Sequence, residues 1–365
     1  MLKLFEVRGF KNFKDTVSLN FADIRDYQFN TACITNGLIG KMIVYGRNSI
    51  GKTNLGLAMF DIVSHLSSKN VTPNLYNYYI NVYSLDGYAE FHYVFQFDGD
   101  LVDYRYRKDE NQALLYERIW INERCLYEYD YQRSRGSMEG IKEMAPTLNW
   151  AFQDMDCILK YVINNTVLDD NHPLRRMMRF VNNMLWFRSL DENRYIGFKT
   201  KSEDYYDFVF ADGMLLELEQ FLHAAGIEEN LIIQKDPDGK KRLYIGGDTL
   251  LPFFRVASSG TKALYTFFYW YKTAKDVSFM FIDEFDAFYH FELAESIVSL
   301  LEKMQSTQVI LTSHNTNLLT NRIMRPDCYF ILSKNKLTAL SNATTRELRE
   351  GHNLEKLYMS GEFDG

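Results

Sequence analysis

The sequence lacks several features that would place it in a class at once. No apolar run reaches the roughly 18 residues that a membrane-spanning helix needs. Its N-terminus has no basic start followed by an apolar core, so we expect no signal peptide. The four cysteines lie far apart and form no Cys-x-x-Cys pair, so the pattern predicts neither a zinc site nor a disulfide framework. Together these absences favour a soluble protein of a reducing compartment, the cytoplasm.

Repeated motifs are also absent. No internal repeat, low-complexity tract or heptad run is present, which excludes a long coiled-coil arm. The chain has 365 residues, 46% of them hydrophobic, which is enough for one large domain or two lobes. A charged fraction of 24% argues against wholesale disorder. The net charge of −7 gives no compositional argument for nucleic-acid binding, although a local basic patch would suffice for it.

Hydrophobic periodicity divides the chain into stretches of different character. Strand-like runs alternate with turns over residues 1–45, and residues 52–66 have a helical pattern. Residues 138–230 are expected to be mostly helical, and a hairpin is expected around Asp238 and Gly239. Over residues 78–130 the pattern predicts an antiparallel meander of five short strands: Tyr79–Leu85, Tyr88–Phe97, Leu101–Arg107, Ala113–Ile121 and Arg124–Tyr129.

After Ser258 the chain returns to alternating helix and strand, as at its start. The middle is therefore interpreted as an insertion into a core that both ends of the chain build. The expected parts are a core of residues 1–70 and 250–365, an antiparallel β lobe of residues 71–135, and a mainly helical inserted lobe of residues 136–249.

A glycine-rich segment supplies the strongest local signal. Residues 46–53 match G-x-x-x-x-G-K-[ST] at every required position, between a short apolar run and a helical one. Glycine lets a backbone wrap closely around phosphate, and the amides there and at the following helix start attract the anion. Lys52 is expected to reach the β- and γ-phosphates, and the Thr53 hydroxyl to ligate Mg²⁺. The predicted cradle comprises Gly46, Arg47, Asn48, Ser49, Ile50, Gly51, Lys52, Thr53 and Asn54.

A second signal is an apolar run, residues 278–282, that ends in two carboxylates, Asp283 and Glu284. Strand ends of a parallel sheet face the ligand crevice. There Asp283 could hold Mg²⁺ through water, and Glu284 could orient or deprotonate a water for in-line attack on a γ-phosphoryl group. Alone, such a strand end could equally be a solvated sheet edge. The cradle at residues 46–53 favours the functional interpretation.

For the weaker candidates, a functional role and an ordinary structural role both remain open. His314 follows another apolar run, residues 308–312, where it could sense a γ-phosphate or simply be a polar residue after a strand. Ser259 and Gly260 precede a helical run and could cap it, or could present its N-terminus to a phosphate held by a second chain. Gln96 is a candidate for a metal-contacting glutamine and equally for a solvent-facing strand residue.

The combined motifs resemble those of a known group of proteins. They are similar to the ABC-type ATPases of the SMC, RecF and OLD-like group, and most closely to the small AAA-fifteen-type ATP/GTPase family often found in bacterial defence loci. Residues 10–15 resemble the F-x-N-F first strand and turn of that family, and residues 46–54 its GxNxxGKTN cradle. Residues 283–290 resemble its DE-x-D-x-x-x-H motif, and residues 348–363 its closing segment.

The resemblance implies an α/β fold, namely a P-loop NTPase mixed sheet like that of ABC ATPases, with an antiparallel β lobe and an inserted helical lobe. It implies ATP and Mg²⁺ as ligands, with the ATP closed between two copies by Ser259 and Gly260 of a degenerate signature motif. Asp286 would lie in the D-loop, Glu284 would support hydrolysis, and His314 would be the switch histidine. The signature departs from that of ABC transporters, which implies slow hydrolysis.

Partners follow from the same resemblance. It implies a homodimer with a regulatory or mechanical output in anti-phage defence. No nuclease motif follows the ATPase motifs, so the effector, a nuclease or a toxin, is expected to be a separate protein. Two rival interpretations stay open: a non-hydrolysing ATP-bound scaffold of a larger complex, and a RecF/SMC-like DNA-binding ATPase. A nucleotide or protein kinase is a weaker rival, because it would not need the signature-like segment.

Two further features have a functional and a structural interpretation. Basic residues within 105–135 and 175–179 could grip a nucleic-acid backbone, but interleaved acidic residues favour an ordinary solvated face for the first group. The helical run after the signature-like segment has six aromatic residues among the seven positions 265–271. Core packing is the favoured interpretation, although so many aromatics exceed one buried stripe and some could contact a partner.

Overall fold

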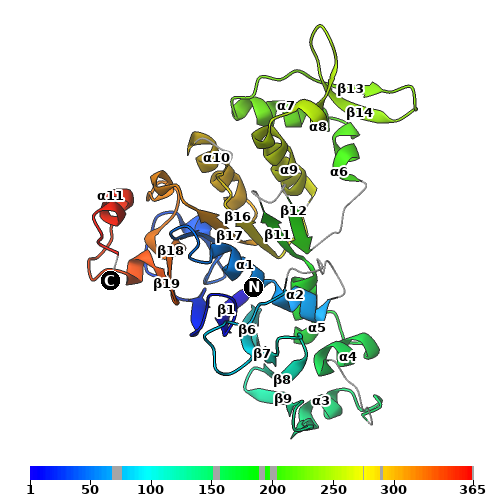
Figure 1. Cartoon of the computed structure of the whole chain (residues 1–365), viewed down its shortest axis with the longest axis vertical. Coiled ribbons are helices and arrows are strands. Elements are labelled where there is room, and N and C mark those ends of the chain that lie inside the picture. The colour runs from blue at the N-terminus through cyan, green and yellow to red at the C-terminus, as the bar shows by residue number, and fades with distance from the viewer. Residues whose placement is uncertain are drawn as a thin grey trace.

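The structure is a computed structural model that describes residues 1–67, 76–150, 157–188, 194–197, 204–273, 275–287 and 291–363. Two seven-stranded sheets organise this part of the chain. Figure 1 shows the antiparallel sheet at one end, the mixed central sheet in the middle, and a group of helices with a hairpin at the other end. None of the described helices combines the length and apolar character that crossing a membrane requires.

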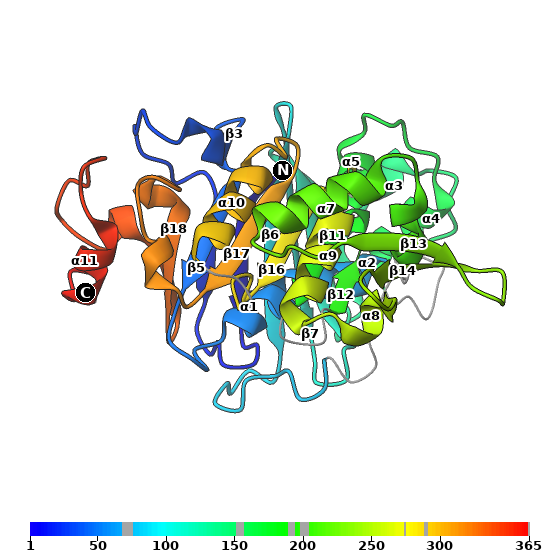
Figure 2. The same cartoon turned by 90° about the horizontal axis from the view of Figure 1, so that it is seen from above.

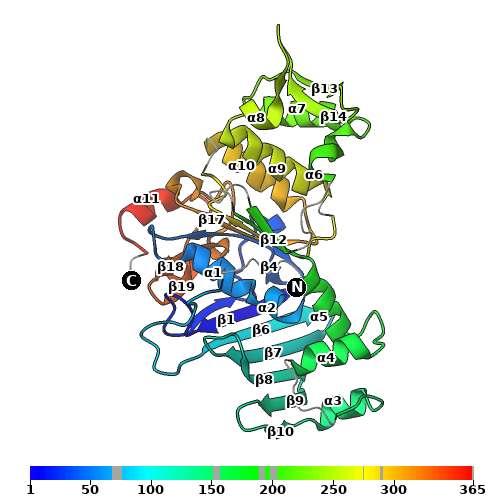
Figure 3. The same ribbon diagram turned by 45° about the vertical axis from the view of Figure 1, so that its right-hand side comes forward.

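The antiparallel sheet has the strand order β10-β9-β8-β7-β6-β1-β2. Figure 3 shows β1, β6, β7, β8, β9 and β10 following one another below the central sheet. Its longest strands alternate buried and half-buried residues, so one face is packed and the other meets solvent. The strands are β1 (Leu2–Arg8), β2 (Val17–Asn20), β6 (Ala89–Phe97), β7 (Asp100–Lys108), β8 (Leu114–Ile121), β9 (Arg124–Asp130) and β10 (Arg135–Ser137).

Four of the five expected meander strands are present, but the first is not. Within Tyr79–Leu85 only Ile80 makes a bridge, to Phe10. Instead of a ladder, the backbone amide of Asn81 donates to the Gly9 carbonyl. Leu85 is fully exposed. The apolar side chains of Tyr79–Leu85 therefore predict a strand, but no described strand pairs with this segment.

The central sheet has the order β12-β11-β16-β17-β5-β18-β19, with five parallel strands between antiparallel edges. The strands β5, β16 and β17 are buried at every residue, as expected of parallel strands covered on both faces. The strands are β5 (Lys41–Tyr45), β11 (Met184–Arg188), β12 (Arg194–Gly197), β16 (Phe279–Asp283), β17 (Gln308–Ser313), β18 (Tyr329–Ser333) and β19 (Lys336–Ala339).

Strands β11 and β12 lie within residues 136–249, which were expected to be mainly helical. β11 pairs in parallel with β16, so this stretch contributes to the central sheet. Its short apolar run, residues 184–187, fits a buried helix or a buried strand equally well, and only the pairing with β16 decides between them. Similarly, β1 and β2 join the antiparallel sheet from the start of the chain. The division into a core and two lobes stays a prediction.

Helices α1 (Lys52–Met59) and α2 (Asp61–Leu66) lie between the two sheets. Gly56 of α1 faces the Phe281 ring of β16. From the other sheet, the Tyr93 hydroxyl donates to the carbonyl oxygen of Ala58 at 3.0 Å. The expected single helix over residues 52–66 is thus two helices, with a break at Phe60.

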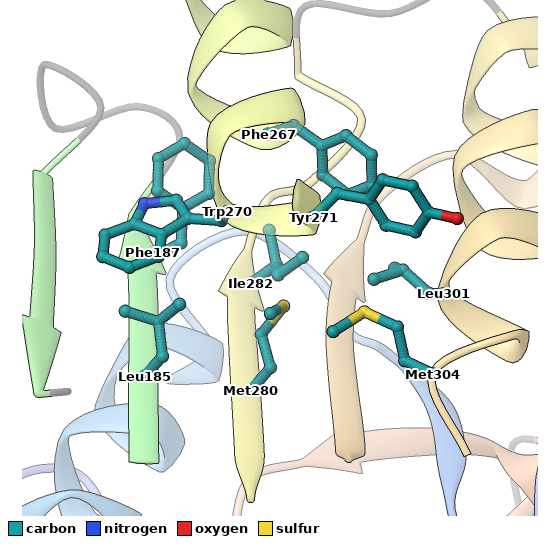
Figure 4. A pocket seen from close by; sticks show the side chains of 9 residues that line it. All are labelled: Leu185, Phe187, Phe267, Trp270, Tyr271, Met280, Ile282, Leu301 and Met304. Atoms are coloured by element: carbon teal, nitrogen blue, oxygen red, sulfur yellow. The ribbon is translucent and has the colours of Figure 1, made fainter. Parts of the chain in front are cut away.

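At the other end lie α6 (Asp204–Asp207), α7 (Met214–Ala224), α8 (Phe253–Val256), α9 (Ser259–Thr273), and the small sheet of β13 (Leu231–Lys235), β14 (Lys241–Ile245) and β15 (Leu251–Pro252). The hairpin expected around Asp238 and Gly239 is β13–β14. Figure 4 shows Phe267 and Trp270 of α9 lying over Leu185 of β11 and Met280 of β16. The aromatic run of α9 is therefore mainly core, and Tyr271 is only partly buried.

Smaller elements complete the fold. Seen from above, α11 and the C-terminus lie at one end, and the β13–β14 hairpin lies at the opposite one (Figure 2). These elements are β3 (Ile34–Thr35), β4 (Leu38–Ile39), α3 (Glu139–Met144), α4 (Ile158–Asn165), α5 (Pro173–Asn182), α10 (Phe291–Glu302) and α11 (Leu354–Met359).

We expect Gly56→Val to destabilise the protein by about 1–3 kcal/mol, because a larger side chain overpacks a filled core. A Cβ at Gly56 would lie 2.7 Å from the buried Phe281 ring. Urea unfolding followed by circular dichroism measures the effect. Gly247→Val is the matched control, since a Cβ there meets only the Thr249 carbonyl oxygen, at 3.8 Å. Equal losses in both variants would contradict the packing argument.

Candidate functional site: a phosphate cradle beside an acidic strand end

The predicted cradle is the loop between β5 and α1. Gly51 caps the start of α1 with a φ of 109°, a left-handed conformation that glycine adopts readily. A Cβ at Gly46 would lie 2.7 Å from Ile50 Cγ2 and 3.0 Å from the Leu332 carbonyl oxygen. A Cβ at Gly51 would collide with the Asn12 amide. The path of the loop therefore requires both glycines, and the positive N-terminal end of α1 is available there to an anion.

Lys52 lies in this cradle and is 5% exposed. Its ammonium group donates to the Gly46 carbonyl oxygen at 3.0 Å and to His314 Nε2 at 2.6 Å. Burial lowers the pKa of Lys52, while three nearby carboxylates, first that of Glu284, oppose this shift. The structure thus brings the cradle lysine and the candidate switch histidine into direct contact.

Asp283 lies at the end of β16, where its carboxylate accepts two hydroxyl hydrogen bonds. Thr53 Oγ1 donates to one oxygen at 2.6 Å, and Thr312 Oγ1 donates to the other at 2.8 Å. Because β16 and β17 are parallel neighbours, their ends meet at one edge of the sheet, next to the cradle that follows β5. Residues far apart in the sequence therefore converge on this carboxylate.

Glu284 follows Asp283 with a φ of 47°, a left-handed conformation that a non-glycine residue rarely adopts. Its backbone amide donates to Thr312 Oγ1 at 2.7 Å. Its carboxylate lies 3.6 Å from His314 Nε2. Such backbone strain, of about 1–3 kcal/mol, persists only where surrounding contacts enforce it, and it concentrates at functional sites.

Asp286 is connected to the same strand end through Ser313, whose hydroxyl donates to its carboxylate at 2.8 Å. Burial raises the pKa of Asp286, and the Ser313 hydrogen bond opposes this shift. Asp286 therefore lies beside the residue that precedes His314.

The oxygen donors at this site suit Mg²⁺. Thr53 contributes a hydroxyl and Asp283 a carboxylate, and both are hard oxygen ligands of the kind that Mg²⁺ prefers beside phosphate oxygens. The two side chains are already within hydrogen-bond distance of each other, so one ion could contact both after a small separation. The residues present fit this cation.

Two sequence-predicted groups are not brought to this site. Gln96 is on β6, where its backbone pairs with Met1, and the Leu2 amide beside it donates to the Gln308 side chain. Gln308 begins β17 and Ser313 ends it, a separation of about 16 Å along a strand. Gln96 therefore lies toward the opposite edge of the sheet from Asp283. The prediction that Gln96 contacts the metal does not agree with this position.

Ser259 and Gly260 begin α9, which packs on the central sheet through its later turns. Ser258 caps this helix, with its hydroxyl accepting from the Thr261 amide at 3.0 Å. Within the described ranges, no hydrogen bond or ion pair joins this first turn to the cradle of the same chain. The structure is thus compatible with capping, and it leaves Ser259 exposed.

Two residues of the site have roles that sequence reasoning did not assign. Thr312 fixes both neighbouring acidic residues, and its only sequence signal was its place at the end of an apolar run. Asn12 donates to the Ile50 carbonyl oxygen at 2.7 Å and accepts from the Asn54 side chain at 2.7 Å. The sequence singles out Asn12 only as part of the F-x-N-F resemblance, although it connects the middle of the cradle to its last residue.

The basic residues of the antiparallel sheet are largely paired with acidic ones. Arg107 pairs with Glu90, Arg118 with Asp103, and the buried Lys108 with Asp61 at 2.8 Å. Arg124, Arg133, Arg175, Arg176 and Arg179 also have acidic partners. These basic residues of the sheet and of α5 are thus paired with acidic ones, which does not favour the RecF-like interpretation.

Several solved structures of SMC head domains are similar to this chain. The SMC head domain from Thermotoga maritima matches at 14% identity with a TM-score of 0.44, over 93% of this chain and 98% of that one. The Smc head domain with a coiled coil and joint from Pyrococcus yayanosii matches at 11% identity with a TM-score of 0.47, over 93% and 96%. Among curated proteins, none shows significant similarity.

The family comparison covers most of the chain. Residues 41–320 match the family described as "AAA domain, putative AbiEii toxin, Type IV TA system". This range includes the cradle, the acidic strand end and His314, and it confirms the resemblance to P-loop ATPases that the motifs indicated. The chain belongs to this family of AAA domains.

Proposed function

We propose that the chain binds ATP with Mg²⁺ in the cradle of residues 46–54 and hydrolyses it. The observation that supports this most is the convergence of Lys52 and Thr53 with Asp283 and His314, because these residues come from opposite ends of the chain. A cationic side chain, a hydroxyl and a carboxylate in this arrangement fit the phosphates of a nucleotide and its cation.

In this proposal Glu284 orients the attacking water and accepts its proton. The left-handed backbone of Glu284 and the hydrogen bond from its amide to Thr312 fix the direction in which its side chain leaves the backbone. His314, in contact with both Lys52 and Glu284, reports the presence of the γ-phosphate. Mg²⁺ bound by Thr53 and Asp283 would neutralise charge on the phosphate oxygens. Asp286, the D-loop candidate, connects this machinery to the neighbouring copy.

We further propose that two copies close around ATP, with Ser259 and Gly260 of one copy covering the nucleotide in the cradle of the other. Two observations support this arrangement. Ser259 is exposed at the first turn of α9, while the later turns of α9 are buried on β11 and β16. The helix end is therefore rigidly mounted and accessible, and such an end favours a negatively charged phosphate.

The output of this cycle is proposed to be control of a separate effector, a nuclease or a toxin, in anti-phage defence. The family description names a toxin of a toxin–antitoxin system. The contacts of Lys52 in the cradle and of Thr53 with Asp283 support a phosphate site in this chain, so the effector chemistry is assigned to another protein. A non-hydrolysing ATP-bound scaffold is the second candidate, since the signature segment departs from its usual form at Thr261 and Lys262.

Glu284→Gln is expected to slow ATP hydrolysis about 100-fold or more, because the amide cannot accept the proton of the attacking water. ATP-bound dimers should then accumulate. Phosphate release and analytical ultracentrifugation with ATP measure both effects. Glu295→Gln is the control, since Glu295 lies on α10 and pairs with the exposed Arg322. An unchanged hydrolysis rate in Glu284→Gln would reject the assigned role, and absence of turnover in the unmodified chain would favour the scaffold.

Thr312→Val is expected to reduce hydrolysis by about tenfold or more, because a lost buried hydrogen bond costs about 1–3 kcal/mol. The variant removes the donor to Asp283 and the acceptor of the Glu284 amide. Thr307→Val is the matched control, because Thr307 is equally buried and its hydroxyl donates only to the Val277 carbonyl oxygen, at 2.7 Å. If both variants lose the same activity, Thr312 contributes only to stability.

Ser259→Arg is expected to prevent ATP-dependent dimerisation, because a long charged side chain would block the exposed first turn of α9 from a second copy. Binding of ATP to the single chain should change less than about threefold, since Ser259 has no hydrogen bond to the cradle among the described residues. Light scattering and a fluorescent ATP analogue measure the two. Ser296→Arg, on the exposed face of α10, is the control. Dimers of undiminished stability in Ser259→Arg would contradict the composite site.

A further inference from the structure

A second cluster of metal-ligating side chains lies away from the cradle, where α2 and the start of α4 contact the antiparallel sheet. His65 is at the end of α2, Glu117 is on β8, and Cys157 immediately precedes α4. One ligand atom of each lies within 4.8 Å of the other two. Cys157 Sγ is 3.8 Å from His65 Nε2 and 3.2 Å from Glu117 Oε1. Three residues from distant parts of the chain thus converge with nitrogen, oxygen and sulfur donors.

The phenol of Tyr104 on β7 supplies a fourth polar atom. Its hydroxyl oxygen lies 2.7 Å from His65 Nε2 and 2.8 Å from Glu117 Oε1. Tetrahedral zinc with bonds of about 2.0–2.3 Å places neighbouring ligand atoms about 3.3–3.6 Å apart. The observed separations of 2.7–3.8 Å lie around that range. Shifts of about half an ångström would complete a four-coordinate site.

The charge of Glu117 needs compensation. Glu117 is fully buried, yet within the described residues no lysine or arginine pairs with it. The nearby cations Lys108 and Arg118 are already paired with Asp61 and Asp103. A buried carboxylate without a cation is costly, even when it is hydrogen-bonded.

The described groups around Glu117 supply hydrogen bonds but no positive charge. Its neighbours are donors: the Tyr131 hydroxyl donates at 2.6 Å, and the Ile158 amide at 3.0 Å.

Cys157 and His65 complete the charge balance. The His65 ring nitrogen Nε2 faces Cys157 Sγ and the Tyr104 hydroxyl, and a neutral imidazole offers a lone pair to a metal. A metal bound here would release the proton of the Cys157 thiol. The Lys160 amide donates to Cys157 Sγ at 3.4 Å, a contact that a thiolate strengthens. One thiolate, one carboxylate and a divalent cation sum to zero charge, which suits a buried site.

We propose that His65, Glu117 and Cys157 bind one structural zinc ion, with Tyr104 or a water as the fourth ligand. Sulfur and nitrogen donors select zinc over Mg²⁺, which prefers oxygen ligands. The site differs from the cradle in its residues and its chemistry. It joins α2, which directly follows the cradle helix α1, to β8 and α4. Zinc there would hold the antiparallel sheet against the helix pair that presents Lys52.

The full chain, expressed in zinc-supplemented medium and purified without chelator or metal affinity, is expected to contain about one zinc per chain by elemental mass spectrometry. Replacing zinc with Co²⁺ should produce the near-ultraviolet thiolate-to-cobalt charge-transfer band and the visible bands of tetrahedral cobalt. Cys157→Ser should lose the charge-transfer band. Cys125→Ser is the matched control, because Cys125 lies on β9 of the same sheet and outside the cluster.

Several outcomes would overturn this proposal. They are a zinc content below about a tenth of an ion per chain, removal of the zinc by one dialysis against a weak chelator, and an unchanged cobalt spectrum in Cys157→Ser. If circular dichroism shows that Cys157→Ser is unfolded, His65→Gln and the spectrum of the unmodified chain decide. Lys52→Ala, which tests the cradle separately, should leave the zinc content unchanged, so failure of one site is distinguishable from failure of the other.

Discussion

The carboxylate of Asp283 is held between two hydroxyl groups, and the arrangement of the whole site depends on that pair of contacts. Thr53 reaches it from the start of α1, and Thr312 from the end of β17. Both contacts exist only while β5, β16 and β17 stay parallel and in register. Because Thr312 also accepts the Glu284 amide, the same hydroxyl sets the left-handed turn that directs the next carboxylate. The register of the sheet therefore determines where both acidic groups lie.

Helix α1 connects the site to both sheets. Its first turn contains Lys52 and Thr53, and its later turns are packed between Phe281 of the central sheet and Tyr93 of the antiparallel sheet. Any displacement of α1 relative to β16 would change the Thr53–Asp283 distance directly. Contacts that fix α1 and α2 against the antiparallel sheet, including the buried Lys108–Asp61 pair, therefore also stabilise the site. The cluster around Glu117 lies at this same junction.

Local signals in the sequence were sufficient for the cradle and the acidic strand end, since each is a short segment whose chemistry is visible in its own residues. The meander and the β13–β14 hairpin were predictable for the same reason, because turns and alternation are local. The other features depend on pairing between strands that are far apart in the sequence. Residues 184–187 form a strand because they pair with β16. Tyr79–Leu85 pairs with no described strand beyond the single bridge of Ile80. The pairing of β6 with β1 places Gln96 toward the far edge of the sheet. The Glu117 cluster likewise has no local spacing that a sequence could reveal.

In the proposed cycle, α9 would couple nucleotide binding to the position of its exposed first turn. Its later turns are packed on β11 and β16, and β16 ends in Asp283 and Glu284. A shift of the acidic strand end on nucleotide binding would thus act on the helix whose exposed first turn is proposed to meet the second copy. Packed interfaces of this kind convert small displacements into discrete rearrangements, because a filled core cannot deform continuously. Phe267 and Trp270 of α9 lie against both strands, so the helix and the two strands share one packed contact.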